Sequence, residues 1–183
     1  MPKTTARLST WTVACVLALS ACTQTPNGPT SGTPTATPTA TPTQKPASVA
    51  ESYAKYDSLR TDLAAALEQK LPGITWSTDK AATLAKSNDG RCILQPASMK
   101  SSADIVEASR NFEDVFAAGD PVLGKYGFPA FGGTDDVPGG WLVARSTDAA
   151  GATVSIEAKG PAYLRITVPV ASASCSPTEI LID

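Results

Sequence analysis

The sequence TVSIEAKGPAYLRITV, residues 153–168, decides the fold. Apolar and polar side chains alternate on both sides of the turn Lys159-Gly160-Pro161. Alternation with a period of two is typical of strands that bury one face, and Gly-Pro between two such runs indicates a turn. The apolar set is Val154, Ile156, Leu164, Ile166 and Val168, and the opposite set is Thr153, Ser155, Glu157, Arg165 and Thr167. We therefore expect an antiparallel hairpin with a single buried face.

A third strand at residues 141–145 extends this hairpin into a meander, with a turn at residues 147–151. A one-sided antiparallel sheet needs a cover for its apolar face. Two amphipathic segments upstream can supply that cover. The sequence thus predicts an α+β fold, a two-layer sandwich in which two helices cover one face of an antiparallel sheet.

The first helix is expected at residues 49–71. It opens with a capping box, in which Ser48 is the N-cap and Glu51 lies three residues further on. Pro72-Gly73 ends it. Its apolar stripe consists of Val49, Tyr53, Tyr56, Leu63, Leu67 and Leu71.

The second helix is expected to begin at Ser101 or Ser102, with Asp104 near its N-terminus. Its buried stripe would be Ile105, Ala108, Phe112, Val115 and Phe116. Gly119 would follow its end as the C′ residue, and Pro121 would start one further turn to Lys125.

The remaining segments give weaker signals. Residues 74–77 and 91–95 suggest short strands, and residues 79–87 fit either a helical turn or an irregular strand. The glycine-rich stretch 126–140 is expected to be a long loop, of the kind that is often functional or mobile. Residues 179–182 could add an edge strand.

The N-terminus has the three parts of a secretory signal. Lys3 and Arg7 precede an apolar run that is far shorter than the ~20 residues of a membrane-spanning helix. The stretch Leu19-Ser20-Ala21-Cys22 resembles a bacterial lipobox. That resemblance implies cleavage between Ala21 and Cys22 by signal peptidase II and a diacylglycerol on the Cys22 thiol. An ordinary secreted protein with an incidental cysteine is the alternative.

The chain therefore divides into a signal peptide at residues 1–21, a lipidated N-terminus with a Thr/Pro-rich stalk at residues 22–48, and one extracytoplasmic domain at residues 49–183. The stalk has no apolar residue larger than alanine. It cannot bury enough surface to order itself, and its proline density favours an extended spacer.

Two cysteines remain in the domain. An exported domain meets an oxidising compartment, so Cys92 and Cys175 are expected to form a disulfide. A catalytic or metal-ligating thiol is the alternative, but the chain has no histidine to accompany it.

Composition excludes several classes of function. The absence of histidine removes Ser-His-Asp and Cys-His catalysis and His-ligated zinc. A net charge of −2 leaves no basic excess for nucleic acid. No cofactor or metal is expected.

The candidate ligand-binding residues are Asp135, Asp136 and Trp141, close together at the end of the glycine-rich stretch. Two adjacent carboxylates could bind Ca²⁺ or act as an acid and a base, although aspartate is also common in turns. Trp141 could line a groove for an apolar ligand or a sugar. Four other aromatic residues could join it there or lie in the core instead: Trp76, Tyr126, Phe128 and Phe131.

The layout of the chain resembles the LppA-like lipoproteins of actinobacteria. The resemblance rests on residues 19–22, on residues 71–76 and on Cys92 and Cys175. It implies a cell-surface lipoprotein and supplies no catalytic residues.

The sequence thus favours a membrane-anchored envelope lipoprotein whose domain is a non-catalytic binding or accessory module, with a small apolar or envelope ligand. One alternative is a cell-wall hydrolase that acts through carboxylates such as Asp135 or Asp136. Another is an interaction protein that presents its exposed sheet face to a partner.

Overall fold

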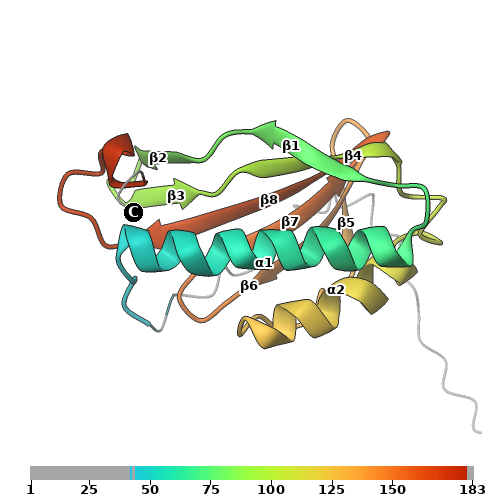
Figure 1. The fold of residues 1–183 in the computed structure, drawn as a ribbon, viewed down its shortest axis with the longest axis horizontal. Coiled ribbons are helices and arrows are strands. Elements are labelled where there is room, and N and C mark those ends of the chain that lie inside the picture. Colours follow the sequence, from blue (N-terminus) through green and yellow to red (C-terminus); the bar gives the residue numbers. More distant parts are fainter. Residues whose placement is uncertain (1–41, 43, 181–183) are drawn as a thin grey trace, which may run out of the picture. The chain divides into compact units, whose positions relative to one another are not determined.

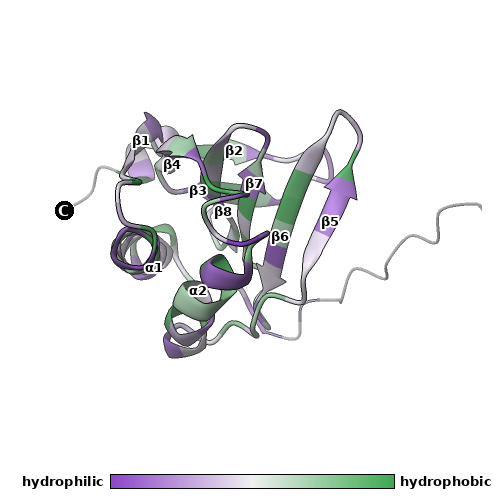
Figure 2. Cartoon of the chain, turned by 90° about the vertical axis from the view of Figure 1, so that its right-hand side faces the viewer, coloured by the Kyte–Doolittle hydropathy of each residue, from purple (hydrophilic) through white to green (hydrophobic). Residues whose placement is uncertain are grey.

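The computed structural model describes Pro42 and residues 44–180. In this part of the chain, an antiparallel sheet carries both α-helices on the same side (Figure 1). Figure 2 shows this layering end-on, with β5 at one edge of the sheet. The elements are α1 (Val49–Lys70), β1 (Trp76–Lys80), β2 (Thr83–Lys86), β3 (Cys92–Gln95), β4 (Ser98–Asp104), α2 (Glu113–Lys125), β5 (Thr134–Val137), β6 (Trp141–Thr147), β7 (Thr153–Ala158), β8 (Pro161–Val170) and the 3₁₀ helix η1 (Pro177–Ile180). The predicted two-layer α+β sandwich is confirmed.

The β7–β8 hairpin is the centre of the sheet, as its alternation predicted. Val154 pairs with Ile166, and Ile156 pairs with Leu164. None of these four side chains is more than 3% exposed. Strand β8 extends beyond the predicted residues 163–168 because it is paired on both edges, with β7 on one and with β4 and then β3 on the other.

Helix α1 confirms its prediction. The Ser48 hydroxyl accepts from the backbone N–H of Glu51, and the Glu51 carboxylate accepts from the backbone N–H of Ser48. The predicted stripe is buried at every position except Tyr53, which is half-buried. The Tyr56 hydroxyl also reaches across to the sheet layer and donates to Asp148 Oδ2 at 2.7 Å.

The predicted start of the second helix is wrong. Residues 98–104 form strand β4, and Asp104 accepts a hydrogen bond from the N–H of Val106 in the turn that follows. A helical turn does begin at Ile105, but Arg110, Asn111 and Phe112 adopt left-handed backbone with φ of 53°, 55° and 73°. This reversal breaks the helix, and α2 starts only at Glu113.

The predicted end of the second helix is also wrong. Gly119 and Pro121 both lie inside α2. A Cβ on Gly119 would lie 3.1 Å from Cε2 of Phe131, so glycine serves close packing there and does not cap the helix. The Asp120 carboxylate accepts from the N–H of Phe131 at 2.9 Å, which fixes the same contact. These contacts between α2 and the loop at Phe131 keep the chain helical through Gly119 and Pro121, where the sequence predicted an end.

The stretch 126–140 is only partly a loop. Its residues Thr134–Val137 form β5, which pairs with β6 through a turn containing Gly139 and Gly140, both at positive φ. A polar strand of this kind covers the edge of β6, which would otherwise expose unpaired backbone groups.

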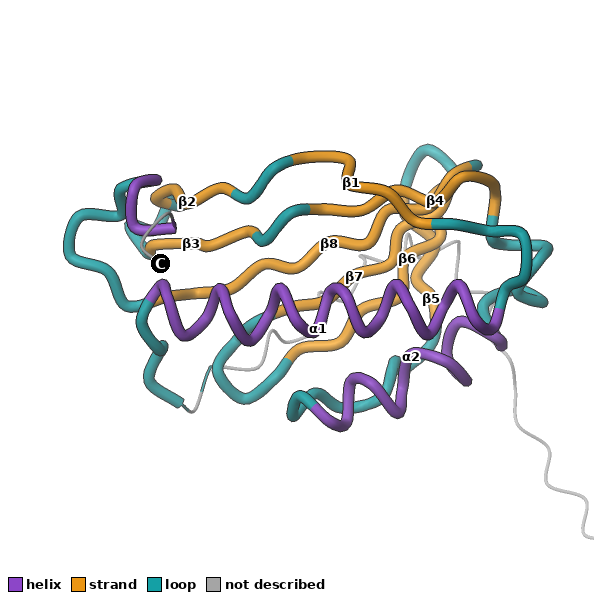
Figure 3. The backbone as a smooth tube through the Cα atoms, in the orientation of Figure 1, coloured by secondary structure: helices purple, strands orange, loops and turns teal. Residues whose placement is uncertain are grey.

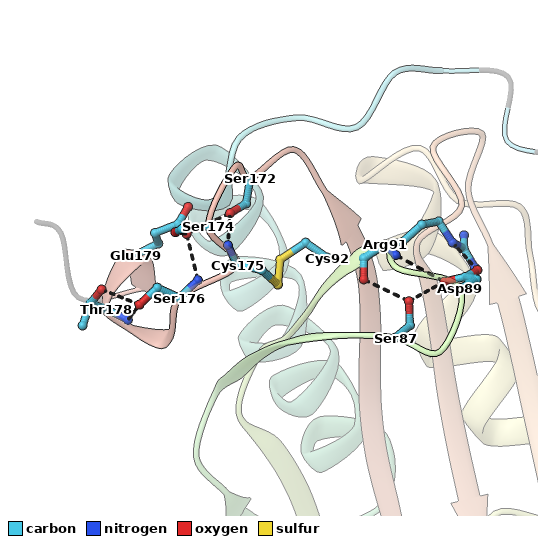
Figure 4. The surroundings of a disulfide bond; sticks show 10 residues. All are labelled: Ser87, Asp89, Arg91, Cys92, Ser172, Ser174, Cys175, Ser176, Thr178 and Glu179. Atoms are coloured by element: carbon cyan, nitrogen blue, oxygen red, sulfur yellow. Dashed lines mark hydrogen bonds and ion pairs between the residues drawn. A yellow bond between two sulfur atoms is a disulfide. The ribbon is translucent and has the colours of Figure 1, made fainter.

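The disulfide between Cys92 and Cys175 is present and joins the start of β3 to the C-terminal segment (Figure 4). Glu179 organises that segment by accepting hydrogen bonds from the hydroxyl of Ser172 and the N–H of Ser176. Residues 177–180 therefore form η1, and the edge strand predicted there is wrong for this part. The end of that prediction, residues 181–182, lies outside the described residues.

Strands β1 and β2 are two pieces of one interrupted line, and so are β4 and β3. Figure 3 shows the two interruptions side by side, at residues 81–82 and 96–97. Pairing is kept on both sides of them, Lys80 with Ser98 and Thr83 with Gln95. Pro96 has no N–H to donate and therefore breaks the ladder in the interior of the sheet.

The last residues of the predicted stalk pair with the domain. The N–H of Ala171, just after β8, donates to the carbonyl of Ala47 at 2.7 Å, and the N–H of Gln44 donates to the carbonyl of Ala149. The predicted signal peptide, Cys22 and the rest of the stalk apart from Pro42 lie outside the described residues.

Candidate functional site

The interruption of the sheet forms a cavity of about 290 Å³. Its lining comes from β1, β2, β3, β4 and β8, together with residues of the two interruptions. Arg165 and Thr167 alternate along β8 with Leu164 and Ile166, which belong to the buried core. The cavity therefore opens on the sheet face opposite α1 and α2, which we call the open face. The lining residues are Lys80, Ala81, Thr83, Gln95, Pro96, Ser98, Arg165, Ile166 and Thr167.

The backbone of β8 contributes to the cavity. Leu164 pairs with Met99, and Val168 pairs with Leu94, but the three residues between them have no pairing partner on that edge. Four residues, 95–98, lie opposite these three, so the two chains bulge apart. Backbone polar groups in a sheet interior are normally paired, and here the break leaves room for another partner.

Each polar side chain of the cavity is able to donate a hydrogen bond. In the described part of the chain, the Lys80 side chain has no ion-pair or hydrogen-bond partner. Gln95 uses its Oε1 to accept from the Thr83 hydroxyl at 3.3 Å, which leaves its NH₂ group available. The Ser98 hydroxyl is engaged with Asp79 Oδ2 at 3.3 Å.

Arg165 is held in place from outside the cavity. Its Nη1 pairs with Glu157 Oε2, and the Ser155 hydroxyl donates to the other oxygen of that carboxylate at 2.9 Å. Its guanidinium also lies 4.9 Å from the ring centroid of Tyr163. These contacts orient the arginine while leaving two-fifths of its side chain exposed.

Trp141, one of the predicted site residues, lies on the open face beside this site. Its ring lies 6.0 Å from the ring of Tyr163, between centroids. Lys100 approaches the same Tyr163 ring at 5.8 Å. Trp141 therefore borders the charged patch around Arg165 but does not line the cavity.

The structure does not bring Asp135 and Asp136 together as a functional pair. They are consecutive residues of β5, so their side chains point to opposite faces of the sheet. Asp135 is exposed and forms an ion pair with Arg145 at 3.3 Å.

The other aromatic residues of the predicted groove belong to the interior or to the helix layer. Phe128 packs edge-on against Tyr56, and Phe131 against Phe116. Trp76 is 7% exposed. Tyr126 donates its hydroxyl to Asp62 at 2.8 Å. These contacts favour the interpretation of the four residues as core and packing residues over the alternative that they line a ligand groove.

A second, shallower hollow lies between the helices. It is lined by Ala65, Ala66 and Gln69 of α1 and by Pro121 and Val122 of α2, with Asp62 and Lys125 across its rim. Hydrogen bonds from Lys125 and Tyr126 lower the pKa of the Asp62 carboxyl. These groups satisfy one another, so the hollow offers a ligand less than the cavity does.

Within the described residues, no helix is long and apolar enough to cross a membrane. The same residues contain no cluster of three or more acidic, cysteine or histidine side chains suited to a metal ion.

Sequence reasoning missed the cavity residues because they come from five separate strands. One signal was present: Pro96 directly follows the predicted strand at residues 91–95. A proline cannot donate to a strand ladder, so at this place it indicates a break in the sheet.

No family model matches the sequence, and no curated protein matches it either. Among solved structures, a DUF4853 family protein from Actinomyces odontolyticus is similar at 7% identity, with a TM-score of 0.47 over 69% of this chain and 70% of that one. LppA from Mycobacterium tuberculosis, a candidate lipoprotein, is similar at 15% identity, with a TM-score of 0.51 over 67% of this chain and 76% of that one. The expected resemblance to the LppA-like lipoproteins is therefore confirmed, as a likeness of fold.

Proposed function

We propose that this chain is a lipid-anchored lipoprotein of the cell envelope and that its domain is a non-catalytic binding module on the extracytoplasmic side. The observation that carries the binding role is the cavity of about 290 Å³ on the open face. This volume lies just below the roughly 300–1,000 Å³ that is usual for small-molecule sites. A small polar molecule of the envelope suits it better than the apolar ligand that the aromatic residues suggested.

The anchor rests on the sequence at Leu19-Ser20-Ala21-Cys22 and on the basic and apolar segments before it. The fold likeness to LppA and the Cys92–Cys175 disulfide both agree with an exported lipoprotein. A single acyl chain binds a membrane only marginally, and two or more hold a protein stably. A diacylglycerol on Cys22 carries two acyl chains and would therefore hold the protein stably at the membrane.

The binding role is favoured over hydrolysis by the chemistry of the lining. No carboxylate or thiol lines the cavity, so the side chains that most often act as a general base or nucleophile in a chain without histidine are missing there. Asp135 and Asp136, the carboxylates that could serve a hydrolase, direct their side chains to opposite faces of β5. Presentation of the open face to a protein partner is the other alternative.

A matched pair of variants tests the binding role. Thr167→Trp places a large ring in the cavity, whereas Thr153→Trp places the same ring on the paired residue of β7, which does not line the cavity. Native mass spectrometry of the full chain, extracted from its own membranes in detergent, should find a small bound mass on wild type and on Thr153→Trp. The mass should be lost from Thr167→Trp.

A bound mass that persists in Thr167→Trp would place the ligand elsewhere. Detection of a protein partner and no small molecule would favour the interaction alternative.

A further inference from the structure

We infer that the ligand of this cavity carries a carboxylate or phosphate group, held between Lys80 and Arg165. This inference rests on the proposed binding function and narrows it to a class of ligand.

The first ground is the charge of the lining. Its only ionisable side chains are Lys80 and Arg165, both cationic. The Lys80 ammonium presents three N–H donors and has no partner in the described part of the chain. A cation that lines a concave site without a partner favours an anion there, because hydrogen bonds between charged groups are about twice as strong as neutral ones.

The second ground is the fixed position of Arg165. Glu157, braced by Ser155, takes one side of the guanidinium, and the Tyr163 ring lies against it. A guanidinium has five N–H donors, and the Glu157 contact through Nη1 leaves others for a ligand. An arginine already held in one geometry loses less rotamer freedom when it binds an oxyanion.

The third ground is the supply of neutral donors. The Gln95 NH₂ group and the Thr167 hydroxyl line the cavity and have no hydrogen-bond partner among the described residues. Successive residues of a strand direct their N–H and C=O groups to alternate edges. Residues 165–167 are paired with β7 but unpaired on the edge facing β3 and β4, so at least one of them directs its N–H and C=O into the break.

Two carboxylates stand near the cavity without lining it. Glu157 is committed to Arg165, and Asp79 reaches the site only through the Ser98 hydroxyl. Asp79 should therefore oppose an anion in the cavity from behind Ser98. The two charges should therefore have opposite effects. Removal of the Lys80 charge should weaken anion binding, and removal of the Asp79 charge should strengthen it.

The experiment uses the ¹⁵N-labelled full chain in detergent micelles, titrated with inorganic phosphate and with acetate at constant ionic strength. Glucose serves as the uncharged probe. The variants are Lys80→Gln and Asp79→Asn, and Lys159→Gln is the matched control because Lys159 is an exposed lysine in the β7–β8 turn, away from the cavity.

The anions should shift the amide signals of residues 165–167 and of the Gln95 side chain. Loss of one charge-assisted hydrogen bond should weaken anion binding about tenfold in Lys80→Gln. Asp79→Asn should bind more tightly than wild type, and Lys159→Gln should match wild type.

Shifts that are unchanged in Lys80→Gln, or no shift with either anion, would overturn the inference. If glucose alone shifted these amides, the anion inference would fail while the binding function stood. If no probe shifted them and the full chain also carried no bound mass, both would fail.

Discussion

The side chain of Tyr56 joins the helix layer to the β6–β7 turn of the sheet. Its hydroxyl donates to Asp148, whose other oxygen accepts from the N–H groups of Ala150 and Ala152. Asp148 thus shapes the β6–β7 turn and receives α1 at the same time. The two residues are 92 positions apart, so no local pattern in the sequence could have paired them.

Removal of the Tyr56 hydroxyl should lower the free energy of unfolding by about 1–3 kcal/mol, because Asp148 then loses a buried partner. Tyr56→Phe tests this in urea denaturation. Tyr53→Phe is the control, since Tyr53 lies on the same helix, is half-buried, and makes no hydroxyl hydrogen bond within the described residues. Equal stability of the two variants would contradict the assignment.

The same hydroxyl predicts a pH dependence. Burial, and then the hydrogen bond and charge of Asp148, raise the pKa of Tyr56 above its ordinary value of 10.0. The folded protein therefore keeps a proton that the unfolded chain releases, and stability should fall as the pH rises above about 10. The wild type and Tyr56→Phe are compared by chemical denaturation between pH 9 and 12. The free energy of unfolding should decline less steeply with pH in the variant.

Asn111 is the middle residue of the left-handed run at 110–112. Asparagine tolerates this backbone far better than a β-branched residue does. Asn111→Val should therefore destabilise the domain by about 1–2 kcal/mol, measured by thermal unfolding. Asn88→Val is the control, because Asn88 is also exposed in a turn but is not among the residues at positive φ. Similar losses in both variants would show that the backbone reversal is not the cause.

Among the elements, those with a strong repeating pattern were predicted well. The β7–β8 hairpin and α1 each carry their periodicity through many residues, so local signals and tertiary packing agree. Helix α2 was misplaced at both ends because its boundaries depend on distant contacts. Ser101, Ser102 and Asp104 suit a helix start, but pairing of β4 with β1 and β8 holds this segment extended.

The effect of these distant contacts on α2 can be measured at its two glycines, Gly119 and Gly124. Gly124 has open space where a Cβ would stand, so Gly124→Ala should raise the free energy of unfolding by about 0.5 kcal/mol through helix propensity. Gly119→Ala should lack this gain, because its Cβ would crowd Phe131, which is itself packed against Phe116. Urea denaturation of both variants tests the difference, and an equal gain would contradict the packing role of Gly119.

The candidate site was less predictable than the fold. Trp141, predicted as a ligand-binding residue, lies on the open face but does not line the cavity. The cavity itself depends on register, because the extra residue in 95–98 relative to 165–167 appears only when β3, β4 and β8 are paired. Lys80 and Arg165 are 85 residues apart in the sequence and carry no motif. Pro96 is the one residue whose local sequence signal indicated the break in the sheet.

For the molecule as a whole, the disulfide between Cys92 and Cys175 closes a long covalent loop of the domain. It joins residues 83 positions apart, which on the chain-entropy model stabilises the fold by ~4.5 kcal/mol. The double variant Cys92→Ser with Cys175→Ser should therefore unfold at a much lower urea concentration, and wild type with a reductant should behave in the same way. An unchanged midpoint would contradict a stabilising role.

The proposed anchor also makes a prediction about the entire chain. Cys22→Ala removes the acceptor of the lipid, so the protein should leave the membrane fraction and be found free in cell fractionation. Cys15→Ala is the matched control, because Cys15 lies within the predicted signal peptide. Retention of Cys22→Ala in the membrane would contradict the lipobox assignment.

The pairing of Ala47 with Ala171 has a mechanical consequence for a tethered protein. The stalk joins the domain at the end of β8, and the cavity is lined by residues 165–167 of the same strand. Under the proposed anchoring, tension from the membrane would enter the domain at residues 44–48, where the hydrogen bonds to Ala149 and Ala171 precede α1. These two hydrogen bonds would have to break before the load reached the first turn of α1, so they would shield the capping box from the pull of the tether.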